Sequence, residues 1–286
     1  MPPPRARLAV LAGGGRVPVL LAEAAAAQGR LAVVIGFEGH ADPAPFARFP
    51  FQAVRIGAAG RLFETLRAHG AHEVVLAGSV RRPAVSALMP DLAGMKVLAR
   101  LGRAMLGGDD TLLSAVIREF EAEGFRVVGA HEVLADLLTP PGQLGRIAAN
   151  EAAQADIARG VAVLRAMGAV DVGQAVVVQQ GLVLGVEAIE GTDALLARVG
   201  PLAREGQGGV LVKLAKPQQE KRVDLPTIGL ATVQGAAAAG LVGIAAEAGR
   251  SLFLDRAEAI AAADAAGLFL LGIDAGASAT SGPSGP

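Results

Sequence analysis

The stretch LAVLAGGGRVPVLLAEAAAAQG, residues 8–29, decides the predicted fold. Its first five residues are an apolar run typical of a buried strand, and three glycines follow directly. Pro18 stands where the first turn of a helix would begin, and Gly29 marks the expected end of that helix. A strand, a glycine loop and a helix in this order predict the start of an α/β unit with a parallel sheet.

The alternation of strand and helix continues from this stretch to about residue 131. We expect further strands at 31–35, 54–56, 73–77 and 125–128, with helices at 61–68, 95–105 and 112–123. Such alternation is typical of a parallel sheet that is covered on both faces. The sequence therefore predicts a Rossmann-like domain over residues 1–132.

A proline- and glycine-containing segment, residues 133–145, reads as the linker to a second domain at 146–275. The second domain is expected to open with a helix at 151–167 and a hairpin of 175–178 with 182–188. Later strands are expected at 210–212, 241–245, 252–254 and 268–273, with a helix at 256–266. Together they predict a second α/β domain with a mixed sheet, followed by a disordered tail at 276–286.

The composition excludes several classes of function. The net charge is −1 and the aromatic residues are nine Phe, with no Trp or Tyr, so no basic patch or stacking platform for nucleic acid is expected. The chain has no Cys, which excludes disulfides and thiolate catalysis. No apolar run reaches the roughly 18 residues of a membrane span. We therefore expect a cytoplasmic protein.

Two loops of the first domain are candidate sites for an anionic group. Ala12, Gly13, Gly14 and Gly15 follow the first strand, and a phosphate can approach such a side-chain-free loop at a helix N-terminus. Ser79 and Arg81 follow the strand at 73–77, at the end where open α/β sheets bind their ligands. The glycines could equally form a tight turn only, and the arginine could simply be solvated.

Two acidic segments each precede a helix. Asp109, Asp110 and Thr111 stand before the helix expected at 112–123, where the aspartates could cap the helix or take part in a Mg²⁺ site. Glu190, Gly191, Thr192 and Asp193 precede the helix expected at 194–199, where a capping residue and a phosphate contact are both reasonable. Strand alternation predicts that Glu187 and Glu190 point to different faces.

The stretch GGVLVKLAKPQQEKRVDLPTIG, residues 208–229, is where we place the chemistry. A buried strand would deliver Lys213 and Lys216 into a polar loop that returns to Asp224. Nearby cations favour the ionised form of a carboxylate, which can hold a metal or orient water, and the lysines could serve a phosphate. The alternative is a solvated hairpin in which Asp224 only caps a turn.

Five segments together resemble the UDP-2,3-diacylglucosamine pyrophosphatases of the LpxI type, which act in lipid A biosynthesis. They are AGGGRVPV at 12–19, GDDTLL at 108–113, EGFRVVGAHEVL at 123–134, GVEAIEGTDALL at 185–196 and VLVKLAKPQQEKRVDLPTIG at 210–229. The segments occur in order and cover nearly the whole chain. As a set they are specific, whereas none would be so alone.

The resemblance implies a Mg²⁺-dependent hydrolase that cleaves UDP-2,3-diacylglucosamine into UMP and lipid X, with the substrate between two domains. It implies that water attacks the phosphorus on the uridine side. The family's essential aspartate corresponds to Asp224, as catalytic residue and as candidate metal ligand. The glycine loop and the GDD segment are implied as substrate contacts, and the EGTD and VKLAKP segments as the facing wall.

Two other classes of function are compatible with these residues. A nucleotide-sugar-binding module would bind the same ligand without hydrolysis, and a nicotinamide-dependent oxidoreductase would use the same first domain. The glycine loop lacks the full dinucleotide fingerprint, and no Tyr or Cys is present as a catalyst, which counts against the oxidoreductase. A homodimer and a peripheral contact with the cytoplasmic face of the inner membrane are both compatible with the resemblance.

Overall fold

A computed structural model of the chain describes residues 6–81, 90–102, 109–216, 222 and 225–276. These residues form two compact units. The first unit extends to Ala135 and takes in Arg222, which pairs with Glu121 through Nη1 and Oε1 at 2.8 Å. The second unit contains the other described residues from Asp136 onward.

The first unit is built on a five-stranded sheet in the order β3-β2-β1-β4-β5, with all neighbours parallel. Its elements are β1 (Leu8–Ala12), α1 (Val17–Ala27), β2 (Leu31–Phe37), β3 (Phe51–Val54), α2 (Ala59–Ala68), β4 (Glu73–Ala77), α3 (Leu92–Leu101), α4 (Asp109–Ala122), β5 (Arg126–Val127) and α5 (Ala130–Val133). Strands β2 and β3 lie on one side of β1, and β4 and β5 lie on its other side, so the strand order reverses between β1 and β4. This is the strand order of a Rossmann-like half, and the predicted fold class is confirmed.

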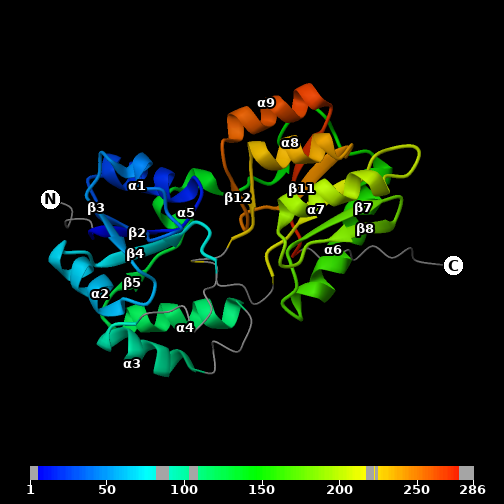
Figure 1. The fold of residues 1–286 in the computed structure, drawn as a ribbon. Helices are drawn as coiled ribbons and strands as arrows, with labels where there is room; N and C mark the ends of the chain where they lie inside the picture. Colours follow the sequence, from blue (N-terminus) through cyan, green and yellow to red (C-terminus); the bar gives the residue numbers. More distant parts are fainter. Residues whose placement is uncertain (1–5, 82–89, 103–108, 217–221, 223–224, 277–286) are drawn as a thin grey trace. The chain divides into compact units, whose positions relative to one another are not determined.

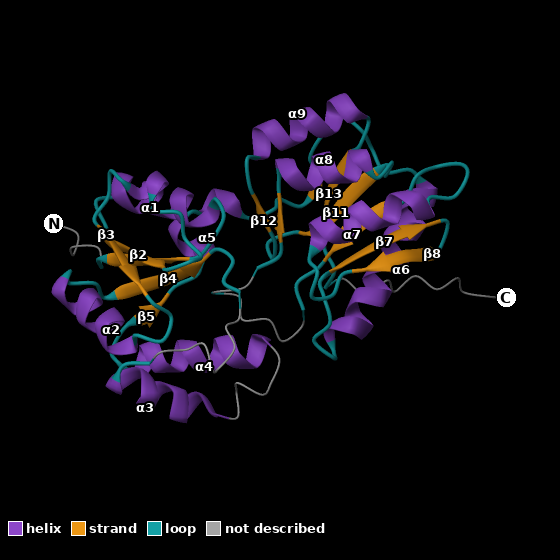
Figure 2. Ribbon diagram, viewed as in Figure 1, coloured by secondary structure: helices purple, strands orange, loops and turns teal. Residues whose placement is uncertain are grey.

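Both faces of this sheet are buried, as the continuous apolar runs predict. On β1, Ala9 and Leu11 belong to a core that also contains Leu66 of α2 and Ile117 of α4. The opposite face is covered by α1 and α5, as Figure 2 shows for the unit on the left of the view. The strands are therefore shielded from water on both sides, and their ligand-accessible groups lie at the strand ends.

Several predicted boundaries in this unit are wrong, among them the start of α3, which is Leu92 rather than 95. The third strand is Phe51–Val54 rather than 54–56, because residues 55–57 already turn toward α2. The ring of Phe51 stacks on Phe46 with centroids 5.7 Å apart, which anchors the strand earlier than its apolar pattern suggested. The helix expected at 112–123 begins at Asp109, so the two aspartates lie in its first turn rather than before it.

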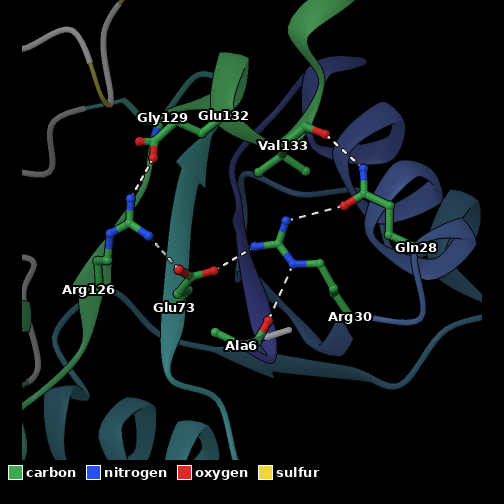
Figure 3. A network of polar contacts seen from close by, with 8 residues as sticks. All are labelled: Ala6, Gln28, Arg30, Glu73, Arg126, Gly129, Glu132 and Val133. Atoms are coloured by element: carbon green, nitrogen blue, oxygen red, sulfur yellow. Dashed lines mark hydrogen bonds and ion pairs between the residues drawn. The ribbon is translucent and has the colours of Figure 1, made fainter. Parts of the chain in front are cut away.

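Charged side chains tie α5 to the amino ends of the strands (Figure 3). Glu73, the first residue of β4, accepts from Arg30 at 2.5 Å and from Arg126 at 2.7 Å. Arg126 also contacts Glu132 at 2.7 Å, and Glu132 accepts from the backbone N–H of Gly129 at the start of α5. These contacts hold the last helix of the unit against the sheet, at the edge opposite the glycine loop.

The second unit contains a mixed six-stranded sheet in the order β6-β13-β11-β9-β7-β8 and a small parallel pair, β10 and β12. Its elements are β6 (Gly142–Gln143), α6 (Glu151–Gly168), β7 (Ala175–Gln179), β8 (Leu182–Val186), α7 (Thr192–Val199), β9 (Val210–Lys213), β10 (Thr227–Ile228), α8 (Leu230–Ala238), β11 (Gly243–Glu247), β12 (Leu252–Phe253), α9 (Arg256–Ala266) and β13 (Phe269–Ile273). The predicted hairpin is confirmed as the antiparallel pair β7 and β8. The mixed sheet of the second domain is confirmed as well.

The second sheet lies between α6 on one face and α7, α8 and α9 on the other (Figures 1 and 2). Alternation along β9 decides which side chains meet which layer. Val210 and Val212 belong to the core under α6, whereas Leu211 belongs to the core under α7 and α8. Lys213 follows in the same alternation as Leu211, so its side chain is directed to the layer of α7 and α8.

The alternative of a solvated hairpin at 208–229 is wrong. β9 pairs with β11 and β7, whereas β10 pairs with β12 in the separate two-stranded sheet. The two strands that flank the lysine-rich loop are therefore not partners. All four residues of β9 are buried, so the stretch is part of the core of the second unit up to Lys213.

Candidate functional site

The glycine loop of the first unit is joined to the loop after β4. The backbone N–H of Gly14 donates to the carbonyl of Ser79 at 2.8 Å, and the N–H of Ser79 donates back to Gly14 at 2.9 Å. The N–H of Gly13 donates to Ala77 at 2.8 Å. The structure thus brings Gly13, Gly14 and Ser79 together at the carboxyl ends of β1 and β4, where the strand order reverses.

Glycine is required here because the two loops touch through their backbones. A Cβ on Gly13 would lie 2.5 Å from the carbonyl oxygen of Ser79, and a Cβ on Gly78 would lie 2.5 Å from that of Gly14. Since the N–H groups of Gly13 and Gly14 are already bonded within the protein, a phosphate-binding role for the loop is limited to Gly15 and the first turn of α1. Ala12 is the buried last residue of β1 and supports the loop.

The other candidate site residues of the first unit lie near the hydrogen-bonded loops of Gly14 and Ser79 or on α4. Arg81 is exposed, and its carbonyl contacts Nε2 of His40 at 3.3 Å. Asp109 and Asp110 lie in the first turn of α4, and Thr111 follows them as an exposed residue. Arg81 therefore lies just after the Ser79 loop, whereas Asp109 and Asp110 belong to α4.

The second unit brings together charged side chains at the carboxyl edge of its sheet. Lys213, the last residue of β9, is 4% exposed. Its Nζ donates to Oγ1 of Thr192 at 2.8 Å and to the carbonyl of Thr227 at 2.9 Å. A β-strand end, the first turn of α7 and the strand before α8 thus converge on one ammonium group.

Thr192 also forms a hydrogen bond to Glu187. Its hydroxyl donates to Oε1 of Glu187 at 2.7 Å, and Oε2 of Glu187 accepts from the backbone N–H of Gln174 at 3.0 Å. Glu187 directly follows β8 and is 6% exposed. A buried ammonium and a buried carboxylate are therefore joined through one threonine hydroxyl, which satisfies both charges in a low-dielectric setting.

Lys216 is held in the same region by a separate pair. Its Nζ lies 2.5 Å from Oδ1 of Asp171. Its carbonyl accepts from Arg250 at 3.3 Å, and Arg250 contacts Glu247 at 3.1 Å. Glu247, the last residue of β11, also accepts from the N–H of Ala215 at 2.9 Å. The chain is thus fixed from Lys213 to Lys216 as it leaves the sheet.

The capping interpretation of Thr192 and Asp193 is wrong, because the N-cap of α7 is Gly191, whose φ is 81°. Thr192 is the first helical residue and uses its hydroxyl in the contact with Lys213. Glu190 is exposed and pairs with Arg198 at 2.8 Å. A hydrogen bond to its own backbone N–H and one from Arg198 hold the pKa of the Glu190 carboxyl below its usual value. Glu190 is therefore an anion bound to α7, apart from the buried Glu187.

Asp224 lies outside the described residues, as do its neighbours at 217–221 and 223. Within the described part of the chain, no three His, Asp or Glu side chains form a group that could hold a metal ion. The carboxylates at the carboxyl edge, those of Glu187, Asp171 and Glu247, each accept hydrogen bonds or ion pairs from the protein. These described residues alone do not fit a divalent cation.

The hollow between α7 and α8 is mainly apolar, unlike the charged region around Lys213 and Glu187. It has a volume of about 770 Å³ and is lined mainly by small side chains of α7, α8 and the turn at Gly200–Leu202. Asp193 is the charged residue in its lining. This groove therefore offers an apolar surface beside the first turn of α7 and little to bind a phosphate.

Sequence reasoning missed the partners that position the lysines. Glu187 directly follows the apolar run LVLGV and Glu247 ends the run GIAAE, and an acid at the end of an apolar run is the signal that could have indicated them. Thr227, which contributes only its carbonyl, and Gln174, which contributes its N–H, carry no such signal, because backbone groups are present at every position.

Comparison with known proteins agrees with both units. The LpxI N-terminal domain model matches residues 7–137, and the LpxI C-terminal domain model matches residues 140–271. A protein from Caulobacter vibrioides named UDP-2,3-diacylglucosamine pyrophosphatase LpxI is 50% identical over 274 residues, which cover 94% of this chain and 98% of that protein.

The fold defines a two-unit α/β protein. Its Rossmann-like sheet ends in hydrogen-bonded loops at Gly14 and Ser79, and its mixed sheet ends in the buried Lys213. The matches to both domain models and the identity along almost the full length decide the particular family. The chain belongs to the LpxI family.

Proposed function

We propose that the protein hydrolyses the pyrophosphate bond of UDP-2,3-diacylglucosamine, giving UMP and lipid X for lipid A synthesis. The observation that carries the proposal is 50% identity to a pyrophosphatase of that name over 94% of the chain. The charged carboxyl edge of the second sheet supports it, because a substrate diphosphate requires fixed cations. We also propose that the substrate binds between the two units.

Hydrolysis needs neutralisation of phosphoryl charge and a positioned water. In the proposed reaction, water oxygen forms a bond to the uridine-side phosphorus, the bond from that phosphorus to the bridging oxygen breaks, and one proton of the water is released. Lipid X leaves with the bridging oxygen. Lys213 is suited to stabilise the negative charge, because its ammonium is held in one place by Thr192 and Thr227.

Asp224 is proposed as the catalytic residue and Mg²⁺ as the cofactor. Both assignments rest on the motif RVDLP at 222–226 and its family resemblance. Lewis-acid stabilisation of the phosphoryl oxygens is what Mg²⁺ would supply when bound. The described carboxylates do not assemble a metal site, and we propose that Asp224 supplies a ligand for the metal.

One assay tests the proposed function directly. The purified protein is incubated with UDP-2,3-diacylglucosamine in ¹⁸O-water, with Mg²⁺ or with a chelator, and the products are identified by mass spectrometry. We expect UMP that carries one ¹⁸O, unlabelled lipid X, and loss of turnover in chelator. Asp224→Asn should bind substrate but release UMP about a thousandfold more slowly. Label in lipid X would instead place the attack at the other phosphorus.

The same preparation separates the remaining alternatives. Saturable binding of the sugar nucleotide without any UMP would favour a non-hydrolytic binding module. A change in NADH fluorescence on titration would favour an oxidoreductase, whereas the proposed hydrolase should leave NADH fluorescence unchanged.

We further propose that the protein is cytoplasmic and meets its acylated substrate at the inner membrane surface, as a monomer or a homodimer. No helix among the described residues is long and apolar enough to cross a membrane. Flotation with phospholipid vesicles, with and without the acylated substrate, tests the membrane contact. Size-exclusion chromatography with light scattering gives the number of chains in each particle.

A further inference from the structure

Glu187 is a buried carboxylate that the proposed reaction does not use. It is 6% exposed, at the end of β8, and both of its oxygens are engaged, one by Thr192 and one by the N–H of Gln174. Burying an ionised carboxylate is costly unless it is paired or hydrogen-bonded. It lies at the same edge of the sheet as Lys213, so its hydrogen bonds there indicate its role.

The direction of the hydrogen bonds links Glu187 to Lys213. An ammonium group can only donate, so the hydroxyl of Thr192 must accept from Nζ of Lys213. The single proton of that hydroxyl is then donated to the carboxylate of Glu187. The carboxylate therefore orients the hydroxyl so that its lone pair faces the lysine.

We propose that Glu187 is a positioning residue for Lys213, acting through the hydroxyl of Thr192, and that this is how the ammonium is held ready for the substrate diphosphate. The assignment rests on the proposed function for its catalytic consequence. The positioning itself does not, because it concerns contacts within the second unit. A preorganised cation is more effective than a mobile one, since it needs no reorganisation as charge develops.

A glutamine at position 187 breaks this arrangement while keeping the side-chain volume. The carboxylate accepts two N–H or O–H groups at once, whereas the amide has one acceptor oxygen and an NH₂ that donates. In Glu187→Gln, either Thr192 or the N–H of Gln174 loses its acceptor. If the NH₂ faces Thr192, it competes with Lys213 for the hydroxyl lone pairs.

Lysine labelling tests the positioning without any substrate. The chain has four lysines, at 96, 213, 216 and 221, so each can be followed by mass spectrometry after acetylation. Lys96 is exposed and serves as the internal reference. We expect slow labelling of Lys213 in the wild type and an increase of about tenfold in Glu187→Gln and Thr192→Val, because a hydrogen bond to a charged group is lost. Thr192→Ser keeps the hydroxyl and should label like the wild type.

A matched control excludes a general effect of removing a buried charge. Asp156 is also 6% exposed and accepts from the N–H groups of Gln180 and Gly181, at the hairpin end of the same sheet. Asp156→Asn should lower the thermal stability and leave both Lys213 labelling and UMP release unchanged. Unchanged Lys213 labelling in both Glu187→Gln and Thr192→Val would overturn the positioning.

Kinetics test the catalytic consequence by a double-mutant cycle. Glu187→Gln should lower kcat about tenfold to a hundredfold with a smaller change in KM, and it should have no further effect in a Lys213→Met background. Additive losses would mean that Glu187 acts independently of Lys213 and would overturn the proposal. A wild-type protein that releases no UMP would instead reject the proposed function, and the labelling result would still decide the positioning.

Discussion

The buried charges that lie at or directly after a strand are found at opposite ends of the strands in the two sheets. Among the described residues of the first unit, the buried charged side chain is Glu73, at the amino end of β4. In the second unit, Lys213, Glu187 and Glu247 lie at the carboxyl edge, whereas Asp156 of α6 accepts hydrogen bonds at the hairpin end. At the carboxyl edge of the first sheet, the described residues include two loops that are hydrogen-bonded through the backbones of Gly14 and Ser79.

This difference indicates a division of labour. The amino-end charges of the first unit contact one another and hold α5, so they serve stability (Figure 3). The carboxyl-end charges of the second unit contact the chain up to Lys216, shortly before Asp224 in the sequence, and we propose that they serve the chemistry. In this proposal the first unit contributes a closely packed backbone turn, and the second contributes charge.

The largest expected effect comes from removing the charge at the second edge. Lys213→Met should lower kcat/KM for UMP release about a hundredfold to a thousandfold, because a fixed cation is lost where phosphoryl charge develops. Lys216→Met should have a smaller effect, since its partner Asp171 lies outside the Thr192 network. Steady-state assays of both variants check the order, and equal losses would show that the buried position of Lys213 confers no advantage.

The next largest effect is on stability and tests the close backbone contact between the Gly14 and Ser79 loops of the first unit. Gly78→Ala should lower the free energy of unfolding by about 2–3 kcal/mol, because the position has φ +87° and the new Cβ would meet the carbonyl of Gly14. Gly15→Ala has a similar φ, +94°, but no atom within 4 Å, so about 1 kcal/mol is expected from the conformation alone. Urea unfolding separates the two, and equal losses would argue against close contact as the reason for glycine.

Neutralising the amino-end charge should affect stability and not turnover. Glu73→Gln leaves Arg30 and Arg126 facing each other and should cost about 2 kcal/mol, less than a fully buried pair because Arg126 is 64% exposed. Thermal unfolding measures the loss, and UMP release at a temperature below the transition serves as the control. A fall in kcat in the folded variant would break the division of labour.

The smallest effect concerns Asp91, which caps two helices of the first unit. Its carboxylate accepts from the N–H of Gly94 in α3 and from Gly60 and Arg61 in α2. Partial burial acts to raise the pKa of Asp91, but these backbone hydrogen bonds outweigh it and hold the pKa below the ordinary 3.8. Asp91→Ala should therefore cost about 1 kcal/mol at neutral pH.

The lowered pKa of Asp91 also predicts the pH dependence of this effect. Because the folded pKa is depressed, the contribution of the charge is complete above the ordinary value and is lost as the pH falls through the folded pKa. The stability difference between wild type and Asp91→Asn, which keeps a capping side chain, should shrink in acid. A difference that is constant from neutral pH to about pH 3 would show that the charge contributes nothing.

Much of the fold follows from local patterns. The strands β1 and β4 and the helix α9 begin and end where the sequence predicts, because a buried strand or helix must be apolar on the faces it buries. The resemblance to the family indicated Thr192 and Lys213, and the structure brings these two side chains within 2.8 Å. The error at β3 has a local cause, because the polar Gln52 interrupts an otherwise apolar strand.

What the sequence by itself determined is the set of elements, the two α/β domains and the family. Those depend on periodicity and on motifs, which are local properties of the chain. Only the tertiary structure decided that β9 and β10 belong to different sheets and that Glu187 meets Lys213 through Thr192. Strand pairing and a hydrogen-bond chain between residues far apart in sequence depend on how the elements pack. The same apolar runs would have been compatible with a simple hairpin.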